Sequence, residues 1–219
     1  MKKFIFVCLL GLICCGPNRS FEGKNIYGST SAQSSSSSGT GGSDQPKWSQ
    51  SDPGTRLGQT LPIGLSWKGF DEGKNISDPV DLNPEDWYDP DGSIGINAVM
   101  VITAKHNCKP CEDEAAMIEN KMATWNSLNK GIKVVTLLVD SKTGDVPLIG
   151  DAYSWKVDYL QVDAAVGIDP ERTFIPDPIF GWPYHTIIDP TQMRVVGTQE
   201  GIIDNYSIIE GLAAANKQH

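Results

Sequence analysis

KHNCKPCEDE, residues 105–114, contains two cysteines, Cys108 and Cys111, separated by two residues. This spacing fits three uses: half of a metal site, a structural disulfide, or a thiol pair that exchanges disulfides with other molecules. The spacing alone does not choose among them. The remaining cysteines, the order of the expected elements and the charge of the chain must do so.

The other cysteines lie near the start of the chain, at positions 8, 14 and 15. A structural zinc site commonly takes four ligands, from two cysteine pairs or from one pair and histidines. The histidines of the chain are His106, His185 and His219. A structural disulfide across a two-residue loop removes little entropy from the unfolded chain and adds little stability. Exchange chemistry is therefore the favoured interpretation of the pair.

Residues 1–14 are typical of a lipoprotein signal peptide. Two lysines precede an apolar run that is too short to span a bilayer. The run ends in LICC, residues 12–15, which resembles the lipobox of bacterial lipoproteins. Leu12 lies three residues before Cys15, so we expect Cys15 to carry the lipid and to anchor the protein to a membrane. Lipidation of Cys14, and ordinary secretion with cleavage nearby, are the alternatives.

The composition changes after the signal peptide. Residues 15–55 are rich in Ser, Gly and other polar residues, so they cannot bury enough apolar surface to fold, and we expect a flexible tether. Residues 56–219 are long enough for one domain with its own core. The chain carries 18 Lys and Arg against 27 Asp and Glu, a net charge of −9. This charge argues against nucleic acid as a partner.

Buried strands are expected on both sides of a helix that follows the cysteine pair. Residues 97–104 and 132–140 are apolar and rich in branched side chains, which predicts strands. Residues 112–131 follow helical spacing, with an acidic first turn and Gly131 at the end. Strand, helix and strand form a βαβ unit, so the two strands are expected to pair in parallel.

The second half of the domain has a less regular pattern. In chain order the expected elements are a helix within residues 147–157, a strand at 159–164, a loop at 165–181, strands at 184–188 and 193–198, and a helix at 204–217. The two later strands lie close enough along the chain to form a hairpin. Asp204 is the candidate N-cap of the last helix.

This order, with C-x-x-C directly after the first strand of the βαβ unit, resembles the thioredoxin fold, and more closely the TlpA/ResA-like thiol–disulfide oxidoreductases. LGQTLP (57–62) is similar to that family's opening segment, CKPCEDE (108–114) fits its C-x-P-C-x-x-E, and GWPYHTIID (181–189) resembles its later proline-led strand. The resemblance covers residues 56–219. It implies an α/β, thioredoxin-like fold, a central mixed β-sheet flanked by helices, with an N-terminal extension. Asn107 departs from the family, which usually has an aromatic residue there.

The resemblance also implies an activity and a cellular location. The protein would be a thiol–disulfide oxidoreductase of the bacterial cell envelope, lipid-anchored and facing the periplasm or extracytoplasmic space. It would reduce disulfides in exported proteins, the alternative being to isomerise them, and it would be re-reduced by a membrane electron donor. Its Cys108–Cys111 pair would form a redox-active disulfide, with no cofactor. The chain has no G-x-G-x-x-G nucleotide signature with which to supply its own electrons.

Each residue of the motif has an expected role. Cys108, at the N-terminus of the expected helix, is the candidate nucleophile because the helix dipole and the neighbouring Lys109 favour a thiolate. Cys111, one turn further, would resolve the mixed disulfide. Pro110 lies in the first turn, where a missing N–H costs nothing. Glu114, three residues after Cys111, is a candidate proton acceptor, the alternative being a solvated acid like its neighbours.

The other half of the site is implied by the resemblance alone. Pro183 would be a cis-proline that faces the cysteine pair, and a substrate chain would bind beside it. The substrate groove would be lined by Lys109, Pro110, Trp182 and Pro183. Packing in the core is an equal alternative for Trp182. Thioredoxin itself has a buried acid six residues before its first cysteine, where this chain has Ile102, so Glu114 is the candidate acid here.

Three other interpretations use the same residues. With His106 and His185 the cysteines could form a copper(I) site. This set of residues resembles that of copper chaperones with a thioredoxin fold, but the cysteines of those proteins have the spacing C-x-x-x-C. Peroxiredoxins, which the chain also resembles, place a Thr or Ser three residues before the reactive cysteine, where this chain has Lys105. The third is a thioredoxin-fold binding module whose disulfide is inert.

Overall fold

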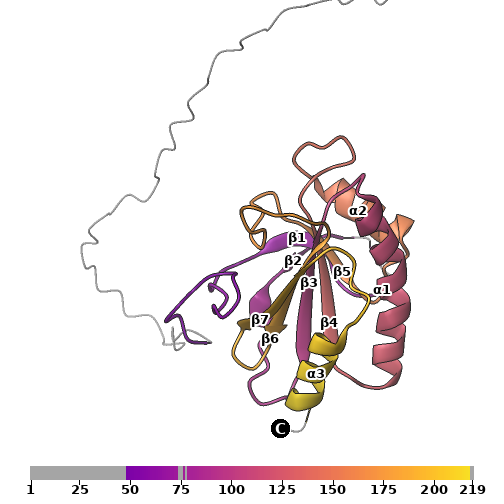
Figure 1. Ribbon diagram of the computed structural model, residues 1–219. Helices are drawn as coiled ribbons and strands as arrows, with labels where there is room; N and C mark the ends of the chain where they lie inside the picture. Colours follow the sequence, from indigo (N-terminus) through magenta and orange to yellow (C-terminus); the bar gives the residue numbers. More distant parts are fainter. Residues whose placement is uncertain (1–47, 74–75, 77, 218–219) are drawn as a thin grey trace, which may run out of the picture. The chain divides into compact units, whose positions relative to one another are not determined.

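The computed structural model describes residues 48–73, 76 and 78–217 (Figure 1). The predicted signal peptide, the candidate lipidated Cys15 with its alternative Cys14, and most of the predicted tether lie outside these residues. Among the described helices, none is long and apolar enough to cross a membrane.

The cysteine pair lies at the junction of a buried strand and a long helix, as predicted. Strand β3, Ala98–Ala104, is buried along its whole length, and helix α1, Lys109–Ser127, follows after a short loop. Strand β4, Ile132–Leu138, returns parallel to β3, which confirms the βαβ unit. Helix α1 begins earlier than predicted because Cys108 is its N-cap and Pro110 fits its first turn.

The sheet contains seven strands in the order β2-β1-β5-β4-β3-β6-β7. Its remaining strands are β1 (Trp67–Phe70), β2 (Val80–Leu82), β5 (Ala165–Ile168), β6 (Tyr184–Asp189) and β7 (Arg194–Glu200). Strands β3, β4 and β5 are parallel, and every other neighbouring pair is antiparallel. The predicted α/β fold with a central mixed sheet is confirmed, and β1 and β2 extend that sheet beyond the predicted strands.

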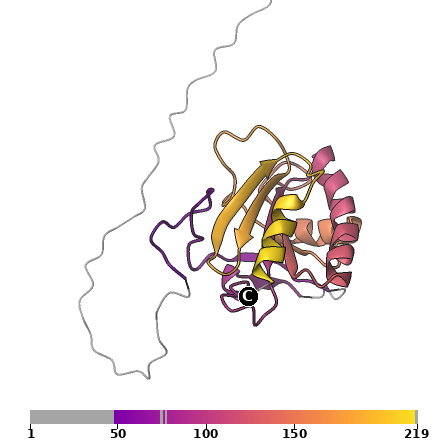
Figure 2. The same cartoon turned by 60° about the horizontal axis from the view of Figure 1, so that its bottom comes forward.

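The three described α-helices lie on one face of the sheet. Helices α2, Ile149–Asp158, and α3, Ser207–Asn216, join α1 there (Figures 1 and 2). Side chains alternate along β3, so Met100 packs with α1 and α3 while Val101 faces the other side. Both faces of β3 are therefore buried, as its continuous apolar run predicted.

The opposite face is covered by aromatic side chains from irregular segments. Trp87, which follows a short 3-10 helix at Pro84–Asp86, packs there together with Trp48. Trp48 is 4% exposed, and its indole N–H donates to the carbonyl oxygen of Leu61 at 2.6 Å. The predicted start of the domain at residue 56 is therefore too late, because a tryptophan from the predicted tether fills part of the core.

Two local predictions are wrong. The chain at 159–164 is not a strand: it leaves α2 through a turn with Leu160 at φ 52°, and β5 begins only at Ala165. Asp204 is not the N-cap of the last helix, because α3 begins at Ser207. There the side-chain oxygen of Asn205 accepts the backbone N–H of Ser207 at 2.9 Å, which satisfies a donor of the first turn.

Helix α3 is tied to α1 through one carboxylate. Glu210 on α3 accepts the indole N–H of the buried Trp125 at 2.8 Å and the ammonium of Lys121 at 2.9 Å. Its other oxygen lies 3.1 Å from the ammonium of Lys130. Hydrogen bonds from Lys121 and Trp125 lower the pKa of Glu210 to about 2.

Replacing this carboxylate should loosen the contact between the helices. We expect Glu210→Gln to lower the free energy of unfolding by about 1–2 kcal/mol at pH 7, at the low end for hydrogen bonds to a charged group because solvent screens the partly exposed Glu210. The folded pKa lies below the ordinary value of 4.5. The stabilisation is therefore complete above about pH 4.5 and is lost as the pH falls toward 2. Urea unfolding at pH 7 and pH 3 measures this, and an equal difference between the proteins at both pH values would contradict it.

Candidate active site

Cys108 and Cys111 form a disulfide at the N-terminus of α1. Their sulfur atoms are 2.10 Å apart and their Cα atoms 5.2 Å apart. Cys108 is 7% exposed and Cys111 is 2% exposed, so the first cysteine is the more accessible. The backbone N–H of Cys111 donates to the sulfur of Cys108 at 3.3 Å. A free helix N–H aimed at this sulfur stabilises negative charge on it, which suits Cys108 to be the thiolate.

Lys109 and Pro110 lie between the cysteines on the exposed surface. The ammonium of Lys109 is 2.6 Å from a carboxylate oxygen of Asp113, one turn further along α1. This hydrogen bond raises the pKa of Lys109. Because Asp113 balances the charge of the lysine, the end of the helix contributes more than Lys109 to stabilising a thiolate on Cys108.

Glu114 is buried, unlike the acids beside it. It is 1% exposed, and one carboxylate oxygen lies 2.8 Å from Nε2 of His185 on β6. The other oxygen accepts the backbone N–H of Ile203 at 3.4 Å and the hydroxyl of Tyr206 at 3.5 Å. The solvated-acid alternative for Glu114 is therefore wrong. Glu114 is thus a buried, hydrogen-bonded carboxylate one turn after Cys111 on α1.

His185 is the residue that sequence reasoning missed as a partner of this acid. It is completely buried, and it pairs across strands with Ile102 of β3. Residues paired in this way point to the same face of a sheet, which here is the face that α1 covers. The one sequence signal for His185 was the position of Ile102, where thioredoxin has its acid. Finding His185 from that position requires knowing the register between β3 and β6.

Trp182 and Pro183 approach the cysteines from the segment before β6. The peptide bond between them is cis, as the resemblance implied, and Pro183 is buried. Trp182 is half-buried and packs against the cluster that contains Cys108. The ammonium of Lys105 lies 4.7 Å from the centre of the Trp182 ring. Trp182 thus contacts the core and keeps part of its surface available beside the disulfide.

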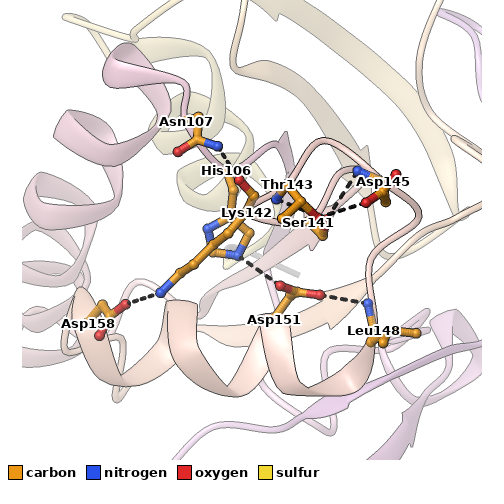
Figure 3. Close-up of polar contacts among 9 residues, drawn as sticks. All are labelled: His106, Asn107, Ser141, Lys142, Thr143, Asp145, Leu148, Asp151 and Asp158. Atoms are coloured by element: carbon orange, nitrogen blue, oxygen red, sulfur yellow. Dashed lines mark hydrogen bonds and ion pairs between the residues drawn. The ribbon is translucent and has the colours of Figure 1, made fainter.

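The loop before Cys108 is held by the segment between β4 and α2 (Figure 3). Asn107 adopts φ 56°, and its side-chain amide donates to the carbonyl oxygen of Lys142. The ammonium of Lys142 in turn pairs with Asp158 of α2 at 3.0 Å. Asn107, which replaces an aromatic residue of the resembling family, thereby connects the disulfide loop to α2.

His106 belongs to the same loop, and its side chain is buried. Its ring packs edge-on against Trp155 with 5.1 Å between ring centres. Figure 3 shows its contact with Asp151, in which Nε2 is 3.9 Å from a carboxylate oxygen. That distance is too long for a hydrogen bond, so the buried Nε2 has no hydrogen-bond partner. Burial lowers the pKa of His106, and Asp151 offsets this only in part.

The lowered pKa of His106 predicts a loss of stability toward acid pH. As the pH falls below about 6.5, the ordinary value for histidine, the unfolded chain binds the proton before the folded one, so unfolding becomes easier. His106→Phe keeps a ring against Trp155 and removes this titration. We expect the variant to lose about 1 kcal/mol less stability than the unchanged protein between pH 7.5 and pH 5.5. Thermal or urea unfolding at both pH values measures this loss of stability. An equal loss in the variant and in the unchanged protein would contradict the prediction.

The residues of the copper alternative are not brought together. His185 faces Glu114, and His106 faces Asp151 and Trp155, while both cysteines are in the disulfide. Across the described part of the chain, no cluster of three or more His, Cys, Asp or Glu side chains is arranged to hold a metal ion. The two histidines therefore have structural contacts of their own.

Comparison with solved structures identifies the fold. The 2-Cys peroxiredoxin of Plasmodium vivax matches with a TM-score of 0.52 at 13% identity, over 76% of this chain and 84% of that one. Peroxiredoxin 6 of Arenicola marina matches with a TM-score of 0.52 at 14% identity, over 75% and 74%. At these identities the likeness shows a thioredoxin-like fold and nothing of the reaction.

A third similar structure is a protein proposed to be the thiol:disulfide interchange protein DsbE of Chlorobium tepidum. It has a TM-score of 0.48 and 23% identity, over 74% of this chain and 97% of that one. No family model matches the chain, and no curated protein matches it.

Proposed function

We propose that the protein is a thiol–disulfide oxidoreductase that reduces disulfides in exported proteins. The observation that carries the proposal is the disulfide at the N-terminus of α1, with the more exposed Cys108 receiving a helix N–H and the buried Glu114 one turn after Cys111. The likeness to peroxiredoxins does not favour a peroxidase, because Lys105 replaces the hydroxyl-bearing residue.

The reaction proceeds in two exchanges. In the reduced protein the Cys108 thiolate attacks one sulfur of a substrate disulfide, which forms a mixed disulfide and releases the other substrate sulfur as a thiolate. The Cys111 thiol then gives its proton to Glu114, and the resulting thiolate attacks Cys108. The Cys108–Cys111 bond forms as the bond to the substrate breaks, so the protein pair is oxidised and the substrate reduced. Both substrate thiolates take up protons from solvent.

The groove in which a substrate chain would lie is formed by two segments. Lys109 and Pro110 are exposed between the cysteines, and Trp182, which precedes Pro183, packs against the cluster that contains Cys108 and Cys111. The backbone beside Pro183 would pair with an extended substrate, and the exposed part of Trp182 would contact its side chains. A membrane electron donor would return the Cys108–Cys111 pair to the dithiol.

The two cysteines should fail in different ways. We expect Cys108→Ser to abolish the ability of the protein to catalyse insulin reduction with dithiothreitol as the reductant. This variant should also form no mixed disulfide with the substrate. Cys111→Ser should also lose turnover, but it should accumulate a covalent complex with the substrate, because Cys108 still attacks and nothing resolves the product. Turbidity and non-reducing electrophoresis measure both. An inactive unchanged protein whose disulfide resists thiol buffers would contradict the proposed function.

We propose further that Cys15 carries a lipid that holds the domain at the outer side of a bacterial membrane. The signal-like residues 1–14 and the spacing of Leu12 to Cys15 support this placement. The polar residues before Trp48 would let the domain move along the membrane surface to its substrates.

Two matched variants, one at each candidate cysteine, test the proposed lipid anchor. In a bacterium fed labelled palmitate, Cys15→Ser should lose the label and leave the membrane fraction. Cys14→Ser should keep both, because the lipobox spacing assigns the modified residue to position 15. Loss of label in Cys14→Ser alone would move the anchor to that residue, and label in both variants would contradict lipidation at this site.

A further inference from the structure

Glu114, the proton acceptor proposed above, forms a buried acid–imidazole pair with His185, to which the exchange chemistry has so far assigned no role. They come from α1 and β6, with exposures of 1% and 0%, and their facing atoms are 2.8 Å apart. The pair sits one helical turn beyond Cys111 and two residues beyond Pro183, so it adjoins both halves of the site. Its burial costs free energy unless its hydrogen bonds are complete.

The contacts of the pair account for its protons. Nδ1 of His185 faces the backbone carbonyl oxygen of Gln199 at 3.3 Å. A carbonyl only accepts, so Nδ1 carries a hydrogen. One further proton then lies between Nε2 and the carboxylate of Glu114. Whichever of the two atoms holds it, the pair contains one shared proton and carries no net charge.

The other contacts of Glu114 also donate. The backbone N–H of Ile203 and the hydroxyl of Tyr206 both face its second oxygen. Burial and the neighbouring Glu114 raise the pKa of Tyr206, so this hydroxyl keeps its hydrogen. Partners from two segments, β6 and residues 203–206, therefore hold the Glu114 carboxylate in one orientation.

We propose that His185 is a positioning residue for the second exchange: it holds Glu114 in place and balances its charge, so that Glu114 can take the proton of Cys111. This inference rests on the proposed function and deepens it. An unbalanced carboxylate beside Cys111 would repel the thiolate that must form there. With the shared proton on Nε2 of His185, the Glu114 carboxylate takes the proton from the Cys111 sulfur, and the Cys111 thiolate displaces the substrate thiolate from Cys108.

The two exchanges can be timed separately with 5,5′-dithiobis(2-nitrobenzoate). When the reduced protein reacts with this disulfide, attack by Cys108 releases one coloured thiolate, and resolution by Cys111 releases the second. In a stopped-flow instrument we expect His185→Leu to slow the second release at least tenfold and to leave the first within about twofold. General acid–base contributions to such steps are commonly 100-fold or more.

Two further variants test whether His185 acts through Glu114. His185→Gln keeps an N–H donor at the position of Nε2, and the second release should be slowed less than in His185→Leu. In the Glu114→Gln background, adding His185→Leu should cause no further slowing, because residues that act as a unit are not additive. Slowing by the same factor with and without Glu114 would overturn the proposal.

A control variant on the same strand separates loss of stability from loss of function. Ile188 of β6 packs on the opposite face, away from α1, so Ile188→Ala should lower the melting temperature and leave both releases unchanged. An unchanged second release in a folded His185→Leu, or an equal slowing of both releases, would overturn the role of His185 and leave the proposed function intact. An unchanged protein that releases no coloured thiolate when reduced would overturn both.

Discussion

The site depends on how β3 ends. The strand is buried on both faces and pairs with β4 on one side and β6 on the other, so its last residue has no freedom to shift. The short loop that follows must place Cys108 at the N-terminus of α1. The helix then supplies the N–H that faces the Cys108 sulfur and, one turn later, turns Glu114 inward. The proposed nucleophile, resolving cysteine and acid are all positioned by this one junction.

The elements nearest the junction could be predicted from sequence because their signals are local. Strand β3, helix α1, strand β4 and the β6–β7 hairpin have periodicities and lengths that do not depend on distant contacts. The start of the domain and strand β5 could not be predicted in the same way. Trp48 belongs to a polar segment and is recruited by a core formed elsewhere. The apolar residues near 160 are diverted by a left-handed turn, so β5 forms later in the chain.

The residues of the candidate site also differ in whether local sequence could predict them. The cysteine pair and Glu114 lie within seven consecutive residues, so spacing on a helix sufficed to group them. The partner of Glu114 is 71 residues away in the chain. Placing His185 beside it requires the exact cross-strand partner of Ile102, and a slip of one residue would turn the imidazole to the opposite face. No local pattern carries that information.

The position of the acid has a further consequence for the chemistry. In thioredoxin the buried acid belongs to the strand before the cysteines, but here that strand position is the apolar Ile102. The acid instead comes from α1, and the neighbouring strand β6 contributes an imidazole to meet it. A lone acid on the strand would have to be either neutral or an isolated buried charge. An acid that faces a histidine has a hydrogen-bond partner inside the protein, and the proposed sharing of one proton would leave the buried pair without net charge. The charge that opposes or assists the Cys111 thiolate is therefore decided jointly by α1 and β6, and the motif at 108–114 supplies only half of it.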